Sequence, residues 1–89
     1  MVPEYRVGDL VQLNVDKKPM GLAVLVDVCG DVFGMEMNRD GLILKTVGRF
    51  MKNDVGVVLQ IDETFGTRII TKSGVIGWGN TWDFIKVEE

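Results

Sequence analysis

Few of the side chains that usually carry out catalysis occur in this sequence. It has no histidine and one cysteine, Cys29, so a Cys–His zinc site and a histidine-activated nucleophile are both excluded. Cys29 falls in a predicted turn between two strands, without a base to generate a thiolate, and is interpreted as an incidental thiol. The sequence therefore predicts a protein that is not an enzyme and holds no cofactor.

Acidic residues are the remaining candidates for a metal site. A series of four occurs in the first half of the chain, at Asp27, Asp31, Glu36 and Asp40. Its spacing differs from the Asp-x-Asp-x-Asp-Gly loop with a closing Glu that binds calcium, so surface and turn roles are favoured. Asp62 and Glu63 are neighbours in a predicted turn and do not face each other as glycosidase pairs do. We expect no metal.

Aromatic residues are the strongest candidates for a binding site. Trp78 and Trp82 flank a predicted turn at residues 79–81, and in a closed barrel Tyr5 and Phe65 would lie on neighbouring loops. Rigid rings at a barrel rim give a large contact area at low entropic cost, which suits peptide binding. These four residues are predicted to bind a partner. In the alternative, one tryptophan plugs the barrel end and the other packs against the chain.

A second candidate surface is hydrophobic. Phe50 and Met51, together with Met20, fall in segments predicted as connections, where a monomer would favour polar side chains. Phe50 and Met51 are predicted as an assembly contact, through which the chain self-associates or docks on a protein partner. The alternative is that some of these side chains cap the core.

The charge balance disfavours nucleic acid as the partner. The net charge is -3, and the basic residues are scattered, whereas nucleic-acid binding depends on basic patches that neutralise phosphates. Lys45, Arg49 and Lys52 form a small basic loop around Phe50. A nucleic-acid-associated barrel therefore remains the alternative function.

In the segments that must position these residues, apolar side chains recur at every second position. Val11, Leu13 and Val15 alternate with polar residues, which predicts a strand with one buried face. Residues 22–28 are apolar on both faces and predict a central strand. Residues 45–54 are predicted as a connection that could extend the preceding strand through Val47. The other predicted strands cover residues 33–37, 42–44, 55–61, 68–72, 75–78 and 84–87.

The chain is predicted to form a single domain over residues 1–89. Hydrophobic residues make up 46% of it and charged residues 26%, which supplies one core and a polar surface. Segments 21–43 and 56–76 match in their pattern of residues. The match indicates either a duplicated three-strand meander or simply two hairpins of equal length. No run approaches the roughly 18 apolar residues that span a bilayer, and the first residues lack a signal-peptide pattern. We expect a cytoplasmic protein without membrane contact.

Several short motifs together resemble a known family. Val7-Gly8-Asp9-Leu10-Val11, residues 56–62, Trp78 and residues 83–87 are similar to the small SH3-like barrels of tailed-phage and bacterial accessory proteins. The resemblance implies an all-β, SH3-like barrel of about five to seven short antiparallel strands. It implies no catalytic residues, and a phage-encoded chain would act in the host cytoplasm. The predicted function is a non-enzymatic protein-interaction or assembly module.

Overall fold

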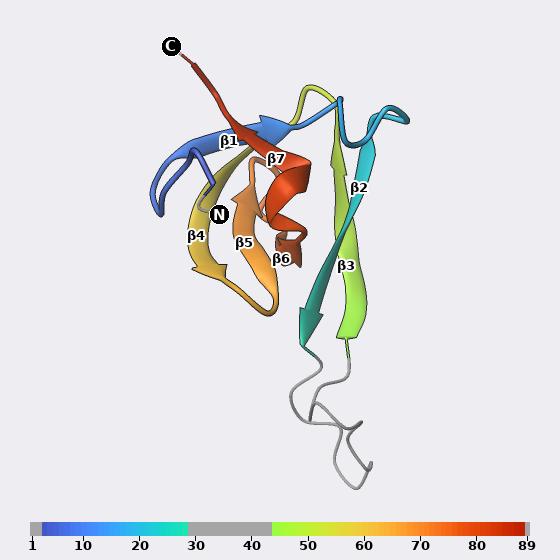
Figure 1. The fold of residues 1–89 in the computed structure, drawn as a ribbon. Coiled ribbons are helices and arrows are strands. Elements are labelled where there is room, and N and C mark those ends of the chain that lie inside the picture. The colour runs from blue at the N-terminus through green and yellow to red at the C-terminus, as the bar shows by residue number, and fades with distance from the viewer. Residues whose placement is uncertain (1–2, 29–43, 89) are drawn as a thin grey trace, which may run out of the picture.

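The computed structural model describes residues 3–28 and 44–88, and this part of the chain is all-β (Figure 1). The strands pair antiparallel in one sheet with the order β3-β2-β6-β5-β4-β1-β7. One 3₁₀ turn, η1 (Thr81–Asp83), precedes the last strand, and no described helix could cross a membrane. The strands are β1 (Leu10–Leu13), β2 (Leu22–Val28), β3 (Leu44–Met51), β4 (Val55–Asp62), β5 (Gly66–Thr71), β6 (Ile76–Gly79) and β7 (Phe84–Lys86). The predicted all-β class is confirmed.

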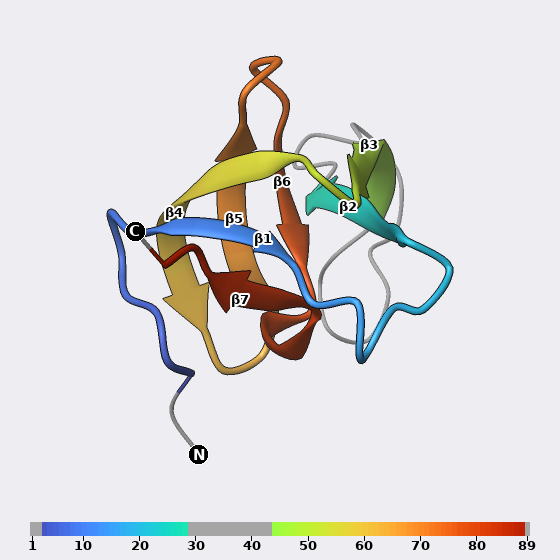
Figure 2. The ribbon, with the colours of Figure 1, turned by 90° about the horizontal axis from the view of Figure 1, so that it is seen from above.

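The sheet curls into a small barrel: in Figure 2, β1 passes in front of β5, and β4, which pairs with both, bends from one to the other. Its two end strands are β3 and β7, which are not hydrogen-bonded to each other in the described part of the chain. Phe50 of β3 meets Phe84 of β7 edge to face, with ring centroids 5.4 Å apart. Side chains therefore close the barrel where backbone pairing is missing.

The core confirms the period-two reading of the sequence. In β1, Val11 and Leu13 are buried while Gln12 between them is exposed. In β5, Thr67, Ile69 and Thr71 are buried and alternate with less buried residues. The core cluster joins Tyr5 of the N-terminal segment with residues of every strand except β6: Val11, Leu13, Ala23, Leu25, Phe50, Val58, Ile69 and Phe84.

The predicted connection over residues 45–54 is confirmed only for residues 52–54 and is wrong before them, because β3 continues past Val47 to Met51. Leu25 lies opposite Gly48 and Val26 lies opposite Thr46, so Val47 is an extra residue in a β-bulge. A Cβ at Gly48 would lie 2.8 Å from Cγ1 of Val75, so any larger residue at this point would force the Val75 side chain or the strand to shift. The sequence pattern predicts that the strand ends near Gly48, whereas the structure has a β-bulge at the neighbouring Val47 and the strand continues.

Some predictions lie outside the described residues. They include the strand at 33–37, the start of the strand at 42–44, Cys29, and the acidic residues Asp31, Glu36 and Asp40. The second half of the first predicted repeat, 21–43, lies there as well. The internal repeat therefore stays a prediction.

Candidate functional site

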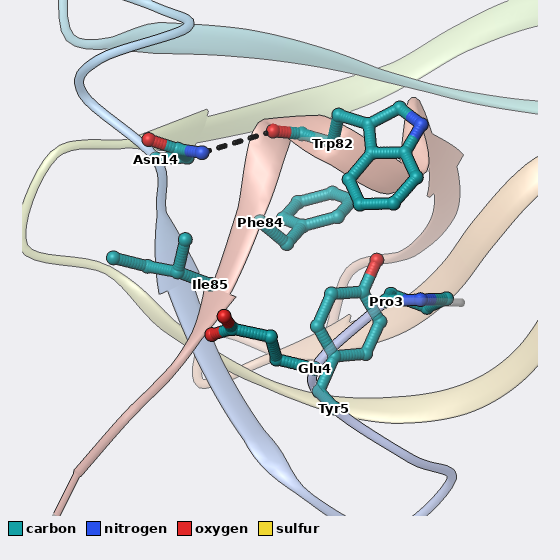
Figure 3. Close-up of a pocket in the computed structure, with 7 residues that line it drawn as sticks. All are labelled: Pro3, Glu4, Tyr5, Asn14, Trp82, Phe84 and Ile85. Atoms are coloured by element: carbon teal, nitrogen blue, oxygen red, sulfur yellow. Dashed lines mark hydrogen bonds between the residues drawn. The ribbon is translucent and has the colours of Figure 1, made fainter. Parts of the chain in front are cut away.

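The four predicted aromatic residues occupy two separate places. Phe65 and Trp78 pack against each other with ring centroids 5.7 Å apart, and both line one groove. Tyr5 and Trp82 line a different, smaller hollow, shown in Figure 3. The predicted single aromatic rim is thus divided into two pairs.

Tyr5 belongs to the core rather than to a binding surface. Its hydroxyl donates a hydrogen bond to the carbonyl oxygen of Thr81 (2.6 Å) and forms another with Oγ1 of Thr67 (2.8 Å). Burial raises the pKa of Tyr5 above its ordinary value, and these hydrogen bonds only partly oppose that effect. Tyr5 therefore anchors the N-terminal segment against η1 and β5.

The hollow in Figure 3 is small. It encloses about 170 Å³ between the N-terminal segment and β7, below the roughly 300 Å³ at which ligand pockets begin. Trp82 stands at its rim and is 42% exposed, and Asn14 Nδ2 donates a hydrogen bond to its carbonyl oxygen. The side chain of Asn80 accepts from the Trp82 backbone N–H and so fixes the start of η1.

A larger groove lies between β2 and η1, and we call it the β2–η1 groove. Its volume is about 400 Å³, within the size range of ligand sites. β2 pairs with β6 at one position only, where Val26 lies opposite Trp78. Past Trp78, β6 ends at Gly79 and the chain enters η1. The groove is lined by Lys18, Leu22, Val24, Val26, Phe65, Trp78, Gly79, Asn80 and Asp83.

One wall of the groove is the outer face of β2. Ala23 and Leu25 are buried in the core, so alternation turns Leu22, Val24 and Val26 toward the groove. Val24 is 49% exposed. The prediction that both faces of this strand are apolar is correct, but among the described residues no helix or strand covers the outer face.

Trp78 forms part of the groove and is not a plug of the barrel. It lies directly opposite Val26, and opposed residues share one face of a sheet. Although Trp78 is only 8% exposed, it lies outside the core cluster. Neither tryptophan fills the barrel interior, which removes the alternative reading in which one of them plugs it.

The other wall of the groove carries an ion pair. Nζ of Lys18 lies 3.6 Å from Oδ2 of Asp83, and their side chains are 40% and 13% exposed. The backbone holds Asp83 in place, since its N–H donates to Asn80 and its carbonyl accepts from Asn14 N–H. Burial raises the pKa of Asp83, and Lys18 opposes that effect in part.

The predicted assembly contact has one exposed member. Phe50 is fully buried, so the prediction that it offers a surface contact is wrong for the folded chain, whereas Met51 is 46% exposed. The two residues alternate in β3 and therefore point to opposite faces. Lys45, Arg49 and Lys52 are exposed, but the aromatic ring predicted to accompany them is in the core.

An apolar stripe crosses the outside of the barrel away from the groove. Leu10, Val57, Ile70 and Ile76 lie directly opposite one another on four neighbouring strands. A shallow hollow of about 250 Å³ lies over the first three. Apart from Thr71 and Lys72, it is lined by apolar residues and glycine, so it offers few polar groups that could orient a ligand.

The sequence analysis missed Lys18, Leu22, Val24, Val26 and Asp83 as site residues. The only signal for the three aliphatic residues was the two-sided apolar character of residues 22–28. Within the described residues, no group of three His, Cys, Asp or Glu side chains could hold a metal ion. In comparisons with known proteins, no family model, curated protein or solved structure matches this chain.

Proposed function

We propose that this chain is a non-enzymatic protein-interaction module that holds an extended segment of a partner protein in the β2–η1 groove. The observation that carries the proposal is the uncovered face of β2, where Leu22, Val24 and Val26 line the groove beside Trp78. Recognition of extended peptides combines a free strand edge with pockets for alternate side chains. β2 offers both, because its pairing with β6 stops at Val26.

The two ends of the sheet are poorer sites for an incoming strand. β7 has three residues, and β3 combines a bulge with exposed Lys45 and Arg49. Charged residues and bulges are the usual means of protecting sheet edges from pairing. This contrast supports β2 as the docking strand.

The resemblance to SH3-like barrels of phage and bacterial accessory proteins supports the same class of function. A cytoplasmic location and a phage origin belong to this proposal through that resemblance alone. The occupant proposed for the groove is an extended segment of a different protein, because the groove is concave and is lined by the aliphatic side chains of β2 on one wall and by Lys18 and Asp83 on the other.

The proposal can be tested with an array of peptides in which Val, Ile, Leu or Phe alternates with Ser. The chain has two tryptophans, so Trp82→Phe leaves Trp78 as the only indole reporter. We expect a subset of the peptides to change Trp78 fluorescence. Val24→Gln should weaken their binding about tenfold, in line with the loss of one apolar side-chain contact.

Ile76→Gln is the matched control, because Ile76 is 38% exposed and lies on the stripe outside the groove. It should leave peptide affinity unchanged. The proposal fails if no peptide alters Trp78 fluorescence, or if both substitutions weaken binding equally. Salt-sensitive binding of an oligonucleotide without any peptide binding would favour the nucleic-acid alternative instead.

A further inference from the structure

Asp83 is the only acidic residue that lines the β2–η1 groove in the described part of the chain. Its side chain is 13% exposed, and the aliphatic residues of β2 form the facing wall. A carboxylate in such surroundings has lost much of its water, so its interaction with a ligand charge is screened less than at an open surface.

The carboxylate of Asp83 has acceptor capacity to spare. An ionised carboxylate has about four acceptor positions, and in the described residues Lys18 is its only charged partner. Their separation of 3.6 Å exceeds the roughly 2.7–2.9 Å of a direct charge-assisted hydrogen bond. The Lys18 side chain is 40% exposed, so it can turn into water when a charge of the partner takes its place beside Asp83.

We infer that the partner segment carries an arginine or lysine that binds the Asp83 carboxylate, next to an apolar side chain that packs on Val24 and Trp78. The inference rests on the proposed function and names the chemistry of the partner. A guanidinium group fits best, because its planar donors can engage both carboxylate oxygens. The charge of Lys18 attracts an acidic segment less strongly, since the more exposed group is better screened.

The test extends the peptide array in the Trp82→Phe background. Each peptide that binds is made with Arg, Lys, Glu or Gln placed in turn at the serine positions. We expect the best Arg peptide to bind about tenfold more tightly than its Gln counterpart and the Glu peptide to bind more weakly than both. Asp83→Asn should abolish this order, so that the Arg, Gln and Glu peptides bind with similar affinity.

Two further variants separate a direct contact from a general charge effect. Asp9→Asn makes the same charge change at a carboxylate that lies 3.7 Å from Lys86 Nζ and outside the groove. It should preserve the preference for Arg. Lys18→Gln removes the competing cation and should raise the affinity of the Arg peptide.

The possible failures are distinguishable. Equal affinity for the Arg, Gln and Glu peptides overturns the inference and leaves the proposed groove standing. Equal loss of the preference in Asp83→Asn and Asp9→Asn also overturns it, because the effect would then be one of net charge. If no peptide binds at all, the proposed function and the inference fall together.

Discussion

The Asp83 side chain is both ionisable and largely buried, so its protonation state affects the stability of the folded chain. Its ordinary pKa is 3.8, and burial raises it in the folded chain more than Lys18 lowers it. A carboxyl with a higher pKa in the folded than in the unfolded state binds its proton more tightly when folded. Its stabilising contribution is therefore complete below the ordinary pKa and is lost as the pH rises through the folded value.

We predict that Asp83→Asn gains stability relative to the wild type as the pH rises from about 3 to about 7. The amide cannot ionise, so the variant escapes the cost of a buried charge. Urea unfolding of both proteins over this range measures the difference. Lys18→Gln should make the wild-type decline steeper, because it removes the cation that lowers the pKa of Asp83. A difference that stays constant with pH would contradict the prediction.

At the residue scale, the sequence identified the right residue types but not their surroundings. Trp78 and Phe65, which the sequence predicts to bind a partner, both line the groove, and their role in binding stays a prediction. Phe50 and Met51 looked equivalent, yet one is buried and the other exposed. Their orientation depends on the register of β3, which a local pattern of hydrophobic residues does not determine.

At the scale of elements, β2 illustrates what the pattern of a single strand can predict. Its bounds match the predicted residues 22–28, because two-sided apolar character and β-branched side chains specify a strand locally. Whether its outer face is covered depends on β6, which turns away after Gly79 into η1. That departure is a long-range feature, so the groove could not be predicted from residues 22–28 alone.

The bulge in β3 gives a prediction at the same scale. Gly48→Ala places a Cβ against Cγ1 of Val75 and should destabilise the chain by about 1–3 kcal/mol. Val75→Ala removes that methyl group, so the double variant should be more stable than the sum of the two single effects implies. Chemical denaturation of the three variants and the wild type completes the cycle. Additivity within about 0.5 kcal/mol would show that the two positions do not interact.

At the scale of the whole molecule, the sheet has open edges that must stay unpaired. β3 exposes Lys45 and Arg49 along one end of the sheet, and charges of this kind oppose edge-to-edge association. We predict that replacing both by threonine increases the mass measured by light scattering as concentration rises.

The control replaces Lys52 and Lys72 by threonine, which changes the net charge equally but at turns instead of at the edge. Both lysines are exposed, so neither substitution disturbs the core. This pair should leave the mass unchanged. An equal rise in both double variants would assign the effect to net charge, and no rise in either would show that the edge needs no protection.

For the molecule as a whole, the all-β fold class could be predicted, because it depends on the alternation of apolar and polar residues within each strand and on the turn residues between strands. The all-β fold follows from alternation in β1, β4 and β5, which the structure confirms. The order of the strands was not predictable, since β2 and β6 are distant in sequence and meet at one residue pair. The candidate groove depends on that meeting, which explains why the sequence pointed to its aromatic residues Phe65 and Trp78 but not to its aliphatic residues Leu22, Val24 and Val26.

The contact between Phe50 and Phe84 has one more consequence. Where all strands are hydrogen-bonded, a barrel can have only certain diameters, because the number of strands and the register between them are whole numbers. The contact between the Phe50 and Phe84 rings, whose centroids are 5.4 Å apart, involves no backbone hydrogen bonds and so does not depend on such a register. At this seam the separation of β3 and β7 depends on how two core side chains pack, so a substitution at Phe50 or Phe84 can change the width of the barrel without adding or removing a strand.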